Sequence, residues 1–353
     1  MSVSRGRIVL IGCLAALGAA VVVVLVGWFL LSTWIHQPAP PLDGTRLADD
    51  STAAYLEVSL RPEDAAARDL VRELLKATRD TSDLPGEVPH WLRGVLARAG
   101  ARPPTDKEIN RLLPLRLVGT ISSAPGNGFA PPLLAINAEG AGRAFRFMDT
   151  MLSLAARRDT DLLRIDHQGT SIYRMPLESH QVWIAVAGTD LIASQEEAAV
   201  RHGLDRLRPG AGEGPAWIRD ALSAMPPDAV LRVITAEGRT SSLGGLISEG
   251  AAEWRAVLAP ALDSTGPLSL WARLQDAETI RGEVRLRDRA ARPDDSSFEL
   301  TLPLAGGPLQ ISLRPRPAEG VWEIEVRGVG TGLGSALRRL RKAMPQGVVL
   351  TGR

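Results

Sequence analysis

Short segments of this chain alternate between apolar and polar residues with a period of two. In residues 280–287 every second position is apolar or glycine, and the positions between are Arg or Glu; residues 322–327 alternate in the same way. This period places the two sets of side chains on opposite faces of a strand, so we expect antiparallel strands with one buried and one solvated face. The expected strands are residues 52–60, 115–121, 133–138, 162–166, 171–175, 182–187, 191–194, 228–235, 268–274, 280–287, 298–304, 309–313 and 321–326.

Longer segments carry apolar residues at the spacing of an amphipathic helix. In the stretch that Pro62 opens, Leu70, Val71 and Leu74 lie on one helical face. The segment Thr105–Glu108 has capping-box spacing, which predicts another helix start. Helices are expected at residues 62–79, 88–99, 105–113, 142–157, 195–207, 241–258 and 331–343.

The order of these elements repeats along the chain. A Gly/Pro-rich break at Arg208–Pro215 separates the two sets of strands and helices. The sequence therefore predicts an α+β fold of antiparallel sheets with flanking helices, built as a degenerate duplication. The first α+β unit would be residues 49–209 and the second, shorter unit residues 210–353. Two separate domains and one continuous sheet are both compatible with this pattern.

One segment is apolar throughout rather than periodic. Residues Ile8–Ile35 contain no charged residue, and this run exceeds the ~20 residues that a helix needs to cross a bilayer. Trp28, Phe29 and Trp34 lie near its far end, where amphipathic rings favour the headgroup layer. We expect residues 8–35 to form a transmembrane signal anchor.

Charges on either side of the anchor predict its orientation. Arg5 and Arg7 precede it, whereas acidic residues predominate between residues 43 and 50 on its other side. Positive charge is retained in the cytoplasm, so we expect residues 1–7 to be a cytoplasmic tail. The chain is then a single-pass inner-membrane protein, in which a Pro-rich tether, residues 36–48, leads to an extracytoplasmic, periplasmic part.

Two alternative interpretations of this segment fit its composition less well. A cleaved signal peptide has an apolar core of ~7–15 residues and a small-residue cleavage site, whereas this segment is longer and ends in aromatic residues. Leu10–Cys13 resembles the lipobox that precedes a lipidated cysteine, but a full signal core is missing before it. We therefore interpret Cys13 as a lipid-facing or packing residue.

Composition narrows the class of protein further. The chain has 353 residues, a formal net charge of +1 and 45% hydrophobic residues, which is typical of a globular protein. Its near-neutral balance argues against a dedicated nucleic-acid-binding protein. Cys13 is the single cysteine, so we expect neither an intrachain disulfide framework nor a cysteine metal site. An exported part of this length can bury a sizeable core without disulfides.

Three segments of the exported part have a distinctive composition. Asp50–Leu56 (DSTAAYL) opens the first strand, Leu133–Phe147 joins a strand to a Gly/Ala-rich helix start, and Gln181–Ala198 is a hairpin that ends in a helix start. With the anchor, the tether and the repeated strand–helix units, they resemble bacterial extracytoplasmic proteins of the domain-of-unknown-function family with serial number 3352, over residues 49–240. The resemblance implies the architecture and export of the chain, and it transfers no catalytic residues.

Few residues have the pattern of a catalytic or metal site. Asp166 and His167 in one hairpin turn, with Glu178 and His180 before the next strand, are candidate metal ligands if the hairpins stack. No pair of histidines has the spacing of a zinc helix motif, so we expect these four residues to be solvated. The sequence contains neither the nucleophile elbow of serine hydrolases nor a Walker loop. We therefore assign no catalytic residue, metal or cofactor.

Three further groups of residues have features of an anion-binding site. Gly328–Gly334 is a glycine-rich turn between a predicted strand and a predicted helix, the context of a phosphate cradle, but its spacing fits no nucleotide fingerprint. A basic run, Arg338–Lys342, lies on the last predicted helix, and arginines alternate along residues 280–287. We interpret the basic run as a solvated helix face that the helix dipole favours, and the arginines as a solvated strand face.

Together these features predict a membrane-tethered extracytoplasmic module that binds or assembles with another envelope component. Its expected partners are the lipid bilayer, through residues 8–35, and an envelope protein; nucleic acid is not expected. The alternatives are a carrier of apolar ligands or lipids, which needs a deep apolar cavity, and an exported hydrolase, which needs converging carboxylates or a His–Ser pair. The sequence favours the non-enzymatic module over both.

Overall fold

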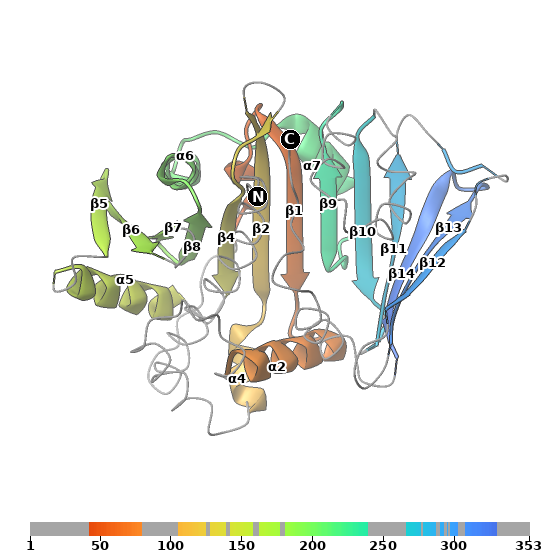
Figure 1. The fold of residues 1–353 in the computed structure, drawn as a ribbon, viewed down its shortest axis with the longest axis horizontal. Helices are drawn as coiled ribbons and strands as arrows, with labels where there is room; N and C mark the ends of the chain where they lie inside the picture. Colours follow the sequence, from red (N-terminus) through yellow and green to blue (C-terminus); the bar gives the residue numbers. More distant parts are fainter. Residues whose placement is uncertain are drawn as a thin grey trace, which may run out of the picture.

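The computed structural model contains an antiparallel sheet with helices on both faces, which confirms the expected α+β fold (Figure 1). The described residues are 42–79, 105–124, 128–138, 142–157, 162–176, 181–238, 266–276, 278–286, 290–292, 295, 297–302 and 308–329. The predicted anchor, residues 8–35, and the helices predicted at 88–99, 241–258 and 331–343 lie outside these ranges. Among the described residues, no helix is both long and apolar enough to cross a membrane.

All strands of the described ranges belong to one 14-stranded sheet, and every pairing between them is antiparallel. The strands are β1 (Thr52–Leu60), β2 (Leu115–Ala124), β3 (Gly128–Phe129), β4 (Leu133–Ala138), β5 (Leu163–His167), β6 (Thr170–Pro176), β7 (Gln181–Ala187), β8 (Asp190–Ser194), β9 (Leu231–Thr235), β10 (Leu268–Leu274), β11 (Thr279–Leu286), β12 (Phe298–Leu302), β13 (Leu309–Arg316) and β14 (Val321–Gly328). Their order is β12-β13-β14-β11-β10-β9-β1-β2-β4-β8-β7-β6-β5, and β3 pairs with β2.

Strand β1 lies at the centre of the sheet and joins its two halves. It pairs with β2 on one side and with β9 on the other. Outward from β1 the order is β2, β4 and then β8 back to β5, and outward from β9 it is β10, β11 and then β14 back to β12 (Figure 1). The last strand of the first half, β8, therefore pairs with both β4 and β7. In the same way the last strand of the second half, β14, pairs with both β11 and β13. A single sheet crosses the break at residues 208–215.

Helices pack on both faces of the sheet, over its first half and over β9. They are the 3-10 helix η1 (Gly44–Leu47), α2 (Ala65–Arg79), α4 (Asp106–Leu112), α5 (Gly142–Ala156), α6 (Glu197–Leu207) and α7 (Ala216–Ser223). Helices α2, α4 and α5 contribute to one hydrophobic core, and η1, α6 and α7 contribute to a second. The sheet separates these two cores.

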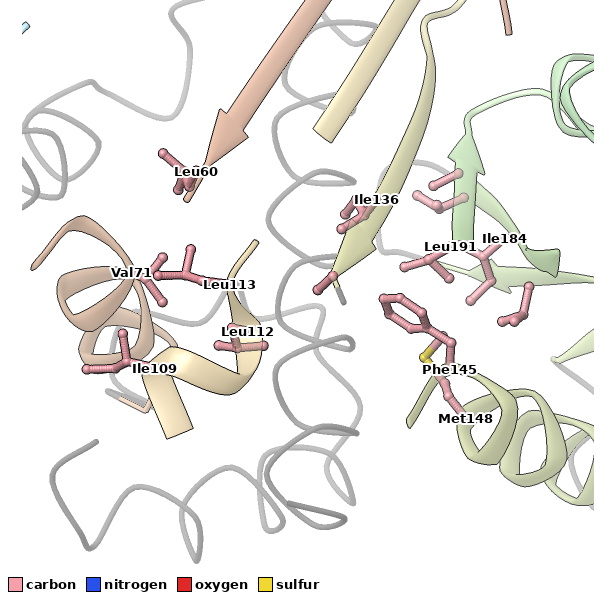
Figure 2. Packing of buried hydrophobic residues seen from close by; sticks show 14 of the residues in the cluster. Leu60, Val71, Ile109, Leu112, Leu113, Ile136, Phe145, Met148, Ile184 and Leu191 are labelled. Atoms are coloured by element: carbon pink, nitrogen blue, oxygen red, sulfur yellow. The ribbon is translucent and has the colours of Figure 1, made fainter. Parts of the chain in front are cut away.

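The first core joins α2, α4 and α5 to the strands. Figure 2 shows Phe145 and Met148 of α5 pointing toward Ile184 of β7 and Leu191 of β8. A second group of side chains, from α2 and α4, gathers near Leu60 at the end of β1 (Figure 2). These side chains are buried, so the helices cover apolar strand positions that water would otherwise reach.

Strand β7 shows how the sheet is buried on both faces. Val182, Ile184 and Val186 belong to the first core, whereas Trp183 and Ala185 belong to the second. Successive side chains of a strand point to opposite faces, so a strand that is covered on both sides has a continuous apolar sequence. This accounts for the run VWIAVA, which alternation alone does not explain.

The second half of the sheet keeps the predicted alternation. In β13, Leu309, Ile311 and Leu313 are buried, whereas Gln310 and Arg314 are exposed. The buried residues form a third core with apolar positions of β10, β11 and β14. One face of this half is thus apolar and buried, and the other face carries charged side chains.

Candidate functional site

The hairpin residues that were candidate metal ligands have different environments. Asp166 is exposed and accepts a hydrogen bond from Gly169 N at 3.2 Å, as expected for a solvated turn. The side chain of His167 is only 11% exposed, and its Nε2 lies 2.8 Å from Asp205 Oδ1 on α6. The prediction that His167 is solvated is therefore wrong, because the β5–β6 hairpin packs against a helix that follows much later in the sequence.

Both ring nitrogens of His167 have partners. Arg201 Nη1 lies 3.2 Å from Nδ1, and because a guanidinium can only donate, Nδ1 accepts and Nε2 donates to Asp205. The histidine thus connects the hairpin to α6. Within the described ranges, no group of three His, Cys, Asp or Glu side chains could hold a metal ion. Glu178 and His180 lie outside the described residues.

The three groups with features of an anion-binding site, which we interpreted as solvated or as a turn, provide no such site in the described part of the chain. Arg281 Nε on β11 lies 3.0 Å from Glu325 Oε2 and 3.5 Å from Glu323 Oε1 on β14, so carboxylates across the sheet neutralise its charge. Gly328 ends β14. The rest of the glycine-rich turn, except Val329, and the basic run Arg338–Lys342 lie outside the described residues, as do the anchor residues.

A different group of charged side chains lies at the centre of the sheet. Tyr55 and Glu57 are two residues apart on β1 and therefore point to the same face, which η1 and α7 cover. Arg232 of β9 lies directly opposite Glu57, and Arg116 of β2 is its diagonal neighbour on the other side. Glu57 is 3% exposed, so its carboxylate is buried between two guanidinium groups.

Glu57 accepts hydrogen bonds on both carboxylate oxygens. Arg232 Nη1 donates to Oε1 at 2.9 Å, and Arg116 Nη2 lies 3.1 Å from the same oxygen. Tyr55 Oη donates to Oε2 at 2.8 Å. Arg232 Nη2 donates to the two carbonyl oxygens of Pro226–Pro227, at 3.0 Å each. The carboxylate and its neighbours are therefore held in one geometry from three strands.

This cluster carries more positive than negative charge. Burial, together with the nearby Glu57 carboxylate, raises the pKa of Tyr55 far above its usual range, so the phenol is a neutral donor. Two guanidiniums, of Arg116 and Arg232, then face one carboxylate. Nε of Arg232 is buried, with no hydrogen-bond partner in the described part of the chain. The side chain of Arg232 is 11% exposed and that of Arg116 is 33% exposed, so the second positive charge lies where water also reaches it.

A pocket of about 280 Å³ opens beside this cluster, between η1 and α7. Its lining residues are Asp43, Gly44, Thr45, Glu57, Arg116, Leu222, Ser223 and Arg232. Asp43 is exposed, and its Oδ1 accepts hydrogen bonds from Thr45 N at 3.2 Å and Thr45 Oγ1 at 2.8 Å. The pocket thus combines a buried basic wall with an acidic group that water reaches.

Close packing and hydrogen bonds hold η1 as one wall of the pocket. A Cβ atom at Gly44 would lie 2.4 Å from Val118 Cγ2 and 2.7 Å from Tyr55 Oη, so only glycine allows η1 to approach the sheet this closely. On the other side, Arg206 Nε of α6 donates to Arg46 O at 2.9 Å. The wall is therefore fixed to both the sheet and α6.

Two other carboxylates have shifted pKa values. Burial raises the pKa of Asp190 to about 6, although Asn137 Nδ2 donates to its carboxylate at 2.6 Å and opposes the shift. Asp49 behaves differently. Burial alone would raise its pKa, but hydrogen bonds from Ser51 and the charge of His202, whose Nε2 lies 3.0 Å away, lower it overall. Neither carboxylate lines the pocket.

The pocket residues belong to no motif that the sequence analysis recognised. Comparisons with protein-family models, with curated proteins and with solved structures found no match for this chain. Arg116, Glu57 and Arg232 were missed because each is a single charged residue in a separate strand. The available signal was Glu57, which interrupts the apolar strand 52–60 on the same face as Tyr55. A charge at a core-facing position requires a partner, although the sequence does not say which.

Proposed function

We propose that this protein is a membrane-tethered extracytoplasmic module that binds another component of the cell envelope at the pocket between η1 and α7. One observation carries the proposal: Arg116 and Arg232 share the single buried carboxylate of Glu57 beside a pocket open to solvent. Arg232 and Glu57 form a buried pair, so the guanidinium of Arg116, which is 33% exposed, is the group that can bind a further anion at the pocket. Such a group is useful where a ligand supplies the opposite charge, because convergent polar groups in a pocket determine specificity.

The membrane attachment is part of this proposal. It is supported by the apolar run of residues 8–35 and by Arg5 and Arg7 before it. Leu42, the first described residue, is 3% exposed, so the fold begins only a few residues beyond the anchor. An extended chain from residue 35 to Leu42 spans at most about 25 Å. The pocket wall, which starts at Asp43, would then lie close to the membrane surface.

The duplication and the family are proposed on separate grounds. Outward from β1 the order is β2, β4, β8, β7, β6, β5, and outward from β9 it is β10, β11, β14, β13, β12. The two orders differ by one strand, but in both the last strand of the half pairs with the second strand outward, and this similarity supports a duplicated strand–helix unit. The relation to the domain-of-unknown-function family with serial number 3352 is supported by the segments Asp50–Leu56 and Gln181–Ala198.

The residues of this pocket fit the two alternative functions, a carrier of apolar ligands and a hydrolase, less well. Leu222 is the one large apolar side chain in its lining, whereas sites for apolar ligands are lined predominantly by hydrophobic groups. A hydrolase would need a free general base. Glu57 Oε2 accepts a hydrogen bond from Tyr55, and Oε1 accepts one from Arg232 and forms an ion pair with Arg116, so neither oxygen is directed at a substrate.

Protease accessibility tests the membrane attachment. Protease added to intact spheroplasts should degrade the chain beyond residue 35 and leave a small anchor fragment, because the positive residues hold the N-terminus inside. A cytoplasmic protein in the same sample should remain intact and serves as the control. Protection of the whole chain until the membrane is lysed would contradict the proposed topology.

Photo-crosslinking in intact cells tests binding at the pocket. A photoreactive residue in place of Ser223, which is exposed and lines the pocket, should form a discrete adduct with an envelope component. The adduct should disappear when Arg116→Gln is added, since that change removes one of the two guanidiniums. Glu299, an exposed residue on β12, provides the matched control position. No adduct at position 223, or an adduct unaffected by Arg116→Gln, would contradict the proposal.

A further inference from the structure

The pocket changes in charge from its inner wall to its opening. On the inner wall, the side chains of Glu57 and Arg232 are 4% and 11% exposed, and that of Arg116 is 33% exposed. Asp43 at the opening is exposed. Arg116 Nη1 donates to the carbonyl oxygen of Leu42, the residue before Asp43. The basic wall and the acidic opening are therefore immediate neighbours.

The two ends of the pocket attract opposite charges. The inner wall has a net charge of one positive unit, and attraction to an anion is stronger there than in water because the effective dielectric constant is lower. Hydrogen bonds described for Asp43 end on Oδ1, which leaves Oδ2 as an acceptor for a cation. A ligand that carried only one charge would satisfy only one end.

From this arrangement we propose that the pocket binds a small zwitterion. Its anionic group, a carboxylate or a phosphate, contacts Arg116 and is attracted by the charge of Arg232, and its ammonium group contacts Asp43. A guanidinium suits both anions, because its planar N–H groups match their oxygens. Glu57 and Tyr55 position the arginines. The assignment rests on the proposed function, which takes this pocket as the binding site.

The size of the pocket limits the ligand. About 280 Å³ is slightly below the range of roughly 300–1,000 Å³ that holds drug-sized ligands, so the zwitterion has few heavy atoms. Leu222 adds a small apolar surface between the charged groups, which suits a short hydrocarbon link. Alanine and phosphoethanolamine both have these properties and serve as probes.

Calorimetric titration of the full chain in detergent micelles tests the proposal. Propionate and ethylamine each lack one charged group of alanine, and ethyl phosphate lacks the ammonium of phosphoethanolamine. At least one zwitterion should bind tenfold or more tightly than each of its analogues that lack one of the two charged groups. Which of the two zwitterions does so distinguishes a carboxylate from a phosphate as the anionic group.

Substitutions at the two ends separate their roles. Asp43→Asn keeps a favourable N-cap residue for η1, so the wall should fold. It should lower the affinity for the zwitterion about tenfold, to that of the anionic analogue, and leave the affinity for that analogue unchanged or higher. Arg116→Gln should weaken both, and Arg116→Lys should restore part of the loss. Glu299→Gln on the far strand β12 should change neither.

The outcomes of this test are distinct from those of the crosslinking experiment. Equal affinities for a zwitterion and its anionic analogue would overturn the zwitterion assignment, as would a zwitterion affinity that Asp43→Asn leaves unchanged. The absence of binding by every probe would overturn it as well. A Ser223 adduct that depends on Arg116 would still support the proposed function in each of these cases, so the two failures are separable.

Discussion

Buried charges dominate the energetics of individual residues in this protein. Glu57 is stabilised by Tyr55, Arg116 and Arg232 from β1, β2 and β9, and removing its carboxylate would leave the buried Arg232 without its ion-pair partner at a cost of about 3–5 kcal/mol. Asp190 and His167 lie in simpler surroundings, where a single substitution changes one interaction. They provide the clearest tests at the scale of the residue.

Replacing Asp190 by asparagine should stabilise the protein at neutral pH. Burial raises the pKa of Asp190 to about 6, from its usual value of 3.8, so the folded state favours the protonated carboxyl. The stability from this group is fully present below pH 4, is lost as the pH rises to about 6, and is constant above that. Asp190→Asn should raise the free energy of unfolding by about 1–2 kcal/mol at pH 7.

Urea unfolding at pH 4, 5, 6 and 7 measures this effect. The difference between Asp190→Asn and the parent should grow over this range and level off, because only the parent titrates. The amide oxygen at position 190 can still accept from Asn137, so the hydrogen bond should survive. A difference that is the same at pH 4 and pH 7 would show that the carboxyl does not titrate between these limits.

Replacing His167 by alanine should destabilise the protein by about 1 kcal/mol, because Asp205 and Arg201 each lose a hydrogen-bond partner. His202→Ala is the matched control. Its side chain is 46% exposed and contacts a single carboxylate, Asp49, so its loss should change stability by less than about 0.5 kcal/mol. Thermal melts of the two variants compare them, and equal shifts would argue against a specific role for His167.

The elements that follow a clear period were predicted well. The strand expected at 52–60 is β1 with the same bounds, and the helix expected at 62–79 ends at Arg79, although it begins at Ala65 rather than near Pro62. Neither η1 nor α7 was predicted. Both are short, with four and eight residues, and tertiary contacts of Leu47 and Ile218 stabilise them, which a local pattern does not reveal.

Enlarging Gly44 should displace η1 from the sheet. The added methyl group of Gly44→Ala overlaps Val118 and Tyr55, and overpacking of this kind costs about 1–3 kcal/mol. Chemical denaturation should detect the loss, and the pocket beside η1 should widen. Asp50→Ala, an exposed change close to η1 in the sequence, is the control and should have little effect. An unchanged stability of Gly44→Ala would contradict the close approach.

At the scale of the whole molecule, β1 and β9 determine how the halves are joined. Leu56 and Val233 are direct cross-strand partners despite their separation in sequence. The repeated order of elements predicted two similar units, but it left open whether their sheets join. Pairing between distant strands depends on which edges meet in the folded chain, and a period of two within each strand carries no information about its neighbour.

The continuous sheet should make the two halves unfold together. Loss of β1 would remove a hydrogen-bonded neighbour from both β2 and β9. Unfolding of either half at the centre of the sheet would therefore expose the central edge strand of the other half. Hydrogen exchange at increasing denaturant should release the amides of β7 and β14 at the same concentration. Exchange of one half well before the other would show that the halves are independently stable.

The position of η1 also has a mechanical consequence. Leu42 is buried and Arg206 bonds to the backbone of η1, so a pull on the chain from the proposed anchor loads η1 before it loads any strand. Because η1 is also a wall of the pocket, the same pull acts on the pocket opening. A ligand that bridges Arg116 on the sheet and Asp43 on η1 would act as a clamp across this joint. A pull from the membrane would then weaken ligand binding, and a bound ligand would make η1 harder to detach from the sheet.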